Sequence, residues 1–169
     1  MSLQTVIKTW DGNDTEALKT AYREYVEAPD FADQLIALLA YGNCQPGASW
    51  LLKYGAERQT SPDLSAEQLA DLLAQAGQLQ SWQSRLHLLQ ILPHIQIPAE
   101  SVTVLEYWLR SGLQDSNKFV RAWSYGGFYL LSEQYPQYRE EADAFIRIAM
   151  RDEVPSVKAR LRQLGISAS

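Results

Sequence analysis

Basic and aromatic side chains recur at matching positions along the chain. One row that we expect to face solvent holds glutamine and basic residues, and the row one helical turn later holds serine, histidine, tyrosine and arginine. Arginine beside tyrosine suits recognition of carboxylates, phosphates or stacked bases, because a guanidinium binds oxyanions through two donors and also stacks on rings. The residues that we predict to bind a partner are Arg85, His87, Arg121, Tyr125, Tyr129, Lys158 and Arg162.

A structural interpretation of the same side chains stays open. Arg121 and Lys158 each follow an aspartate by six residues, so acid–base contacts within the fold could occupy them. Tyr125 and Tyr129 could pack between helices instead of facing a partner. The sequence does not decide between the two interpretations.

Other chemistries find little support in the residue pattern. His87 and His94 are two helical turns apart and could share a helix face, but no third ligand is close and Pro93 disturbs the helix between them. The chain has no nucleophile elbow, phosphate-binding loop or dinucleotide fingerprint. We expect no metal, no cofactor and no catalytic residue, and we expect Cys44 to be a small buried hydrophobic residue.

Composition points to one soluble domain covering residues 1–169. The chain is 46% hydrophobic and 21% charged, which is enough to bury a core. A single cysteine fits a reducing compartment, and neither a membrane span nor a signal peptide is evident, so we expect a cytoplasmic protein. The net charge of −5 is uneven, with 5 Lys/Arg against 11 Asp/Glu up to residue 81 and 10 against 9 beyond it. A mildly acidic total argues against general nucleic-acid binding.

Helical periodicity runs through the segments between the glycines and prolines, so we predict an all-α fold. Asn13 or Asp14 is expected to cap the helix that follows, and Ser65 with Gln68 forms a capping-box pattern. The aromatic segment 118–134 holds two adjacent glycines, and a β-hairpin was the alternative there. We predict a helix, in which the glycines allow a close approach or a bend.

The predicted helices form pairs. Leu35, Leu72, Leu109 and Ile146 align at a step of about 37 residues, and a near-constant period of this size is typical of an α-solenoid. We expect an N-terminal cap and four helix pairs. Their ranges are 1–28, 29–60, 61–97, 98–136 and 137–169. A chance alignment of amphipathic helices is the alternative.

The two C-terminal pairs resemble HEAT repeats. Asp115 ends one turn and Arg121 follows six residues later, and Asp152 with Lys158 repeats this spacing. In the HEAT family such residues form ladders between adjacent repeats. The likeness covers residues 101–164 best and is weaker over 31–97, where Gln45 and Gln83 stand at the basic position. The resemblance implies a HEAT-like α-α superhelix in which the second helix of each pair lines a concave face.

Segment 119–136 also looks somewhat like a helix of the HEAT-like DNA glycosylases that excise alkylated purines. Those enzymes use a basic concave surface with aromatic residues and a carboxylate. They are longer than this chain, and their catalytic residues cannot be mapped onto it position by position.

Basic residues concentrate in the second helix of each predicted pair, and this distribution suggests a function. The second helices of the pairs hold eight Lys/Arg against two Glu, so the basic groups gather on the inner wall that the resemblance implies. We expect a non-enzymatic helical-repeat scaffold that binds an acidic protein or peptide there. The alternative is a nucleic-acid-binding or glycosylase-like protein that uses the same face. The five tryptophans are expected to be mostly core, and an exposed one would mark an interface.

Overall fold

The computed structural model describes residues 1–58 and 63–164, and the described chain is helical without strands, as predicted. It divides into two compact units, Met1–His94 and Ile95–Ser169. The α-helices of the first unit are α1 (Leu3–Thr9), α2 (Glu16–Tyr25), α3 (Phe31–Leu38), α4 (Gln45–Arg58), α5 (Ala66–Ala74) and α6 (Trp82–Ile91). Those of the second are α7 (Val102–Gly112), α8 (Lys118–Gln134), α9 (Arg139–Asp152) and α10 (Pro155–Gln163). None of these helices is long and apolar enough to cross a membrane.

Local sequence explains where several helices of the first unit begin and end. The predicted capping box of α5 is confirmed, since the Ser65 hydroxyl accepts the Gln68 backbone N–H and the Gln68 side chain accepts that of Ser65. Helix α6 ends at Ile91, close before Pro93. The cap predicted for α2 was wrong by one residue. Thr15 is the N-cap, and the Asp14 carboxylate accepts the N–H of the first helical residue instead.

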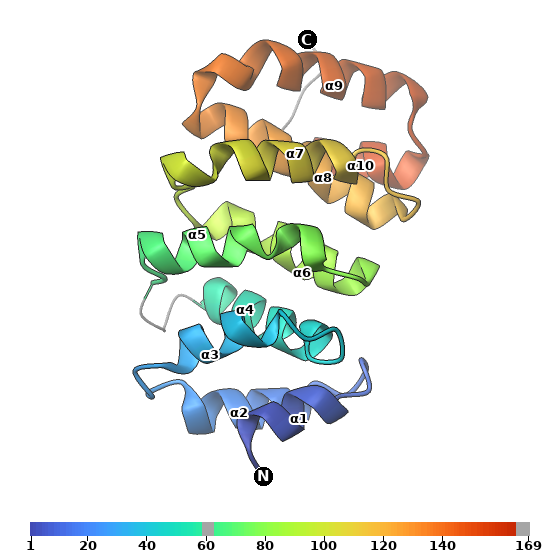
Figure 1. The fold of residues 1–169 in the computed structure, drawn as a ribbon. Helices are drawn as coiled ribbons and strands as arrows, with labels where there is room; N and C mark the ends of the chain where they lie inside the picture. The colour runs from blue at the N-terminus through green and yellow to red at the C-terminus, as the bar shows by residue number, and fades with distance from the viewer. Residues whose placement is uncertain (59–62, 165–169) are drawn as a thin grey trace. The chain divides into compact units, whose positions relative to one another are not determined.

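The first unit is a two-layer packing of helices (Figure 1). Helices α3 and α5 pack against each other in one layer, α4 and α6 pack in the other, and α1 and α2 pack together and onto α4. Leucines from four helices fill the interior, with Leu18, Leu35, Leu51 and Leu72 at most 1% exposed. This packing holds α4 and α6 side by side, and those two helices carry Pro46, Trp50, Gln83 and His87 of the candidate site.

In the second unit, α8 packs against α7, α9 and α10. It spans the predicted residues 118–134 as one helix, capped by the Asn117 side chain, so the hairpin alternative is excluded. One of its two adjacent glycines lies at a tight contact. Gly127 is buried, and a Cβ atom on Gly126 would lie 2.9 Å from Cδ1 of Leu164. The helix also approaches α7 closely at Gly112, where an added Cβ would overlap the Ser124 side chain.

Candidate functional site

Arg121, a predicted partner-binding residue, is held between two turns of the second unit. Its Nη1 donates to the carbonyl oxygens of Asp115 and Ser116 at 3.0 and 3.2 Å, and its Nε donates to Oε1 of Glu153 at 2.7 Å. The arginine thereby ties the turn before α8 to the turn before α10. The ladder was predicted through the Asp115 carboxylate. The structure gives the Arg121 guanidinium the Asp115 carbonyl and the carboxylate of Glu153.

Gln45 links two successive turns of the first unit in a similar way. Its amide nitrogen donates to the carbonyls of Leu39 and Gln78, both at 2.9 Å, and its oxygen accepts the backbone N–H of Gln80. The side chain is 2% exposed, so these bonds satisfy its buried amide. The neutral side chain of Gln45 therefore links two successive turns in the first unit, whereas the charged side chain of Arg121 does so in the second.

Arg85 bonds the turn before its own helix, and Lys158 bonds the last turn of α9. Arg85 donates to the carbonyls of Leu79 and Gln80 at 3.3 and 3.2 Å, and Lys158 donates to that of Arg151 at 3.4 Å. Arg85, Arg121 and Lys158 are each the fourth residue of their helix. The sequence alignment had placed Gln83 in this row, and the structure places Arg85 there instead.

The remaining predicted residues differ in exposure. Tyr125 is 8% exposed and belongs to the core cluster with Val157 and Leu161, and burial raises the pKa of its hydroxyl. Tyr129 packs on the same cluster, and its bond to the Glu133 side chain raises its pKa. Arg162 is exposed on α10. Of these three, Arg162 presents its side chain most openly to a partner.

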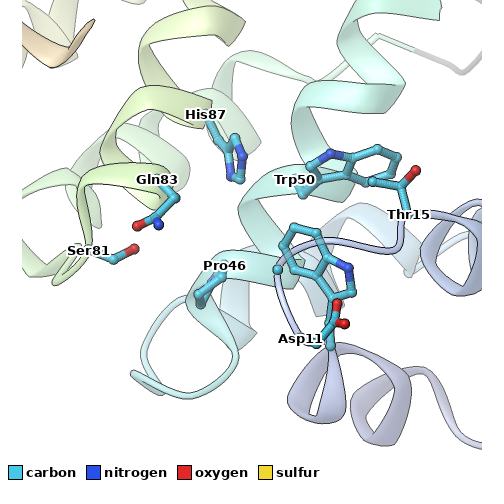
Figure 2. Close-up of a pocket in the computed structure, with 9 residues that line it drawn as sticks. Asp11, Thr15, Pro46, Trp50, Ser81, Gln83 and His87 are labelled. Carbon is cyan, nitrogen blue, oxygen red and sulfur yellow. The ribbon is translucent and has the colours of Figure 1, made fainter.

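A pocket of about 360 Å³ lies in the first unit, and His87 is the one predicted partner-binding residue that lines it. Figure 2 shows side chains of α6 and its preceding turn facing Trp50 of α4 and the α1–α2 loop. Its lining residues are Trp10, Asp11, Gly12, Thr15, Pro46, Trp50, Ser81, Gln83 and His87.

Two indole rings form the apolar part of this pocket. The Trp10 and Trp50 ring centroids are 6.3 Å apart with the planes tilted by 52°. The Trp10 indole N–H donates to the Asp14 carbonyl at 2.8 Å, and Trp50 stacks on Tyr54 at 4.9 Å. Because both rings are half-buried and fixed by these contacts, they lose little freedom when a ligand covers them.

The α1–α2 loop brings a carboxylate to the pocket. Oδ1 of Asp11 accepts the backbone N–H groups of Asn13 and Asp14 at 2.8 and 3.1 Å, and these bonds lower the pKa of Asp11. Gly12 has a φ of 87°, a left-handed conformation that glycine adopts without strain. The turn thus holds an ionised, exposed carboxylate beside the tryptophans.

The opposite wall carries a neutral histidine. His87 Nδ1 lies 2.8 Å from Oγ of Ser49, and that hydroxyl also donates to the Pro46 carbonyl at 3.1 Å. The Ser49 hydroxyl thus contacts both the Pro46 carbonyl and Nδ1 of His87, and these two contacts orient the imidazole ring. Burial, and then the charge of Lys53, lower the pKa of His87 from 6.5 to about 4.

Residues 1–58 and 63–164 contain no group of three or more His, Cys, Asp or Glu side chains placed to hold a metal ion. Cys44 is free and 1% exposed, which confirms it as a buried small residue. The tryptophan prediction is confirmed for Trp108, which is 9% exposed, and was wrong for Trp82, which is 38% exposed.

Sequence reasoning missed the N-terminal half of the pocket. Trp10 and Asp11 fall in the segment predicted to be only a cap, before the first recognisable pair. The signal that could have found them is the Asp-Gly turn directly after a tryptophan.

Comparison with known proteins gives no relative: no family model, curated protein or solved structure matches the chain.

Proposed function

We propose that the protein is a non-enzymatic helical-repeat scaffold that binds a peptide segment of a partner protein. The helix pairs are proposed to stack as a HEAT-like α-α superhelix. Packing within each unit supports this arrangement, because α3 contacts α5, α4 contacts α6, and α8 contacts α10. Equivalent helices therefore meet their counterparts in the next pair, as in stacked repeats.

The pocket between Trp10, Trp50 and His87 is the observation that carries this proposal. Half-buried tryptophans in a concave site are the side chains that contribute most to protein–protein affinity. The pocket is small enough for one or two side chains of an extended peptide. Neighbouring groups such as Gln83 supply polar contacts at its edge.

The acidic partner expected from the sequence finds less support than the pocket does. Basic side chains of the second helices are engaged within the protein: Arg121 pairs with Glu153, and Lys53 lies 3.6 Å from Glu57. Arg58 lies over the Tyr54 ring. These contacts neutralise or cover much of the charge that the sequence had assigned to a partner.

A peptide library displayed against the wild-type protein tests the proposal. Gln83 is exposed and lines the pocket, so Gln83→Arg adds a large charged side chain there without disturbing the core. Gln4→Arg, on the exposed face of α1, is the matched control. Peptides selected on the wild type should bind Gln83→Arg at least about tenfold more weakly and Gln4→Arg equally well. Equal binding to all three proteins would refute the pocket as the binding site.

Nucleic-acid binding or glycosylase-like activity is a second candidate, because the pocket combines two indoles with the Asp11 carboxylate. Aromatic faces stack on bases, and a carboxylate is among the groups that such enzymes use. A mobility-shift assay at low salt, followed by measurement of purine release from alkylated DNA, tests it. No shift and no released base would remove this candidate.

A further inference from the structure

We infer that the Trp10–Trp50 pocket takes the guanidinium group of an arginine side chain carried by the bound peptide. This inference rests on the proposed function and names the group that anchors the peptide. It reverses the charge of the partner expected from the sequence, which was acidic.

Charge in the first unit favours a cation. The unit Met1–His94 holds 6 Lys/Arg against 11 Asp/Glu, so the whole net charge of −5 resides there. Among the nine lining residues there is no lysine or arginine, and Asp11 is the one carboxylate. His87 is half-buried, and its pKa of about 4 keeps it neutral near pH 7. Lys53 is close enough to lower the pKa of His87, but it lies 3.6 Å from Glu57, which offsets its charge. A carboxylate or phosphate ligand would be repelled by Asp11, whereas a cation would be attracted.

The aromatic faces suit a planar cation. A guanidinium stacks on an indole more readily than an ammonium does, because it is flat and weakly hydrated. The chain already places guanidinium groups over its own aromatic rings. Arg160 lies over the Trp123 ring with its central carbon 3.8 Å from the centroid, and Arg58 lies over Tyr54 at 5.1 Å. Trp10 and Trp50 offer the same chemistry to an arginine from outside.

The polar groups of the pocket complement a ligand that only donates hydrogen bonds. The turn N–H groups bond Oδ1 of Asp11, and the second carboxylate oxygen, Oδ2, can also accept hydrogen bonds. His87 contacts Ser49 through Nδ1, and in its neutral form one of its two ring nitrogens accepts a hydrogen bond. Gln83 adds an amide oxygen. A guanidinium has five N–H donors and no acceptor, and its fork can meet a carboxylate through two bonds. Figure 2 shows Asp11 and His87 on opposite sides of the pocket.

The test uses three synthetic probes that differ in one side chain: acetyl-Gly-Arg-Gly-amide, its citrulline counterpart and its lysine counterpart. Citrulline keeps the shape of arginine and loses the charge. Binding is followed by nuclear magnetic resonance of the indole N–H groups, assigned with Trp→Phe variants. The arginine probe should shift the Trp10 and Trp50 resonances in a saturable manner and leave those of Trp108 and Trp123 in place. The citrulline and lysine probes should bind about tenfold more weakly.

Asp11→Asn removes the charge and keeps an oxygen for the turn. It should weaken the arginine probe about tenfold, while Asp71→Asn, on exposed α5 outside the pocket, should leave binding unchanged. Equal binding of citrulline would overturn the inference, as would equal binding of lysine or an unchanged affinity in Asp11→Asn. The test of the proposed function gives a result that is independent of this one. If library peptides depend on Gln83 but not on arginine, the peptide site stands and only the guanidinium assignment falls.

Discussion

Nε of Arg121 lies 2.7 Å from Oε1 of Glu153, and the same guanidinium donates to the carbonyls of Asp115 and Ser116. Both charged side chains are largely buried, at 20% and 11% exposure. The bond to Arg121 lowers the pKa of Glu153, so the acid stays ionised. One side chain thus holds two successive turns at a fixed separation.

Removing the acid should leave that arginine without its counter-charge. We expect Glu153→Ala to lower the free energy of unfolding by about 1–3 kcal/mol. Asp152→Ala is the control, because Asp152 is exposed and bonds the exposed Arg151. It should change stability by less than about 0.5 kcal/mol. Denaturant unfolding of both variants measures the difference, and similar losses would show that the Arg121–Glu153 contact is not the tie we describe.

Gly112 provides a test of helix packing in the second unit. A methyl group there would overlap the Ser124 side chain of α8, so Gly112→Ala should destabilise the protein by about 1–3 kcal/mol. Gly77 has nothing within 4 Å of an added Cβ. Gly77→Ala should therefore be neutral or stabilising by up to about 1 kcal/mol. If thermal unfolding shows that both substitutions stabilise, α7 and α8 do not approach as closely as described.

Tyr125 distinguishes a core role from a binding role. Its ring belongs to the core cluster with Val157 and Leu161 and is 8% exposed, so Tyr125→Ala should cost about 3–5 kcal/mol of stability. Tyr107 is 76% exposed on α7. Tyr107→Ala should change the free energy of unfolding by less than about 0.5 kcal/mol. If the Tyr125→Ala variant is stable but binds peptide weakly, Tyr125 is a binding residue and not a core residue.

Sequence patterns predicted the elements well because their causes are local. The Ser65–Gln68 capping box and the ends of α8 follow from side chains within a few residues. The acidic partner of Arg121, in contrast, depends on long-range packing. Whether Arg121 meets Asp115 or Glu153 is decided by how α9 and α10 dock on α8, and spacing within one turn does not encode that.

The candidate site was predictable only on its α6 side. His87 was identified from its alignment with Ser49, and the structure joins the two by a hydrogen bond. Trp10 and Asp11 belong to no repeat, so a period search could not find them. They reach the pocket because α1 and α2 pack on α4, which is a tertiary contact.

His87 should make stability depend on pH. Its pKa is lowered to about 4 in the folded protein and is near 6.5 when unfolded, so the unfolded chain binds more protons between these values. The contribution of neutral His87 to the free energy of unfolding is fully present above pH 6.5. It falls by up to about 3 kcal/mol as the pH drops to 4. His87→Gln should flatten this slope, whereas His94→Gln, at an exposed position, should keep it. Equal slopes in both variants would mean that His87 does not stay neutral through burial.

The central claim is that the Trp10–Trp50 pocket is where the protein binds its partner. A titration of isotope-labelled protein with a library-selected peptide, read at every backbone amide, tests it most directly. We expect the shifted amides to cluster at residues 10–15, 46–50 and 81–87. Shifts confined to 118–134 and 155–163, with none at 10–15, would contradict the account and place binding on α8 and α10 instead.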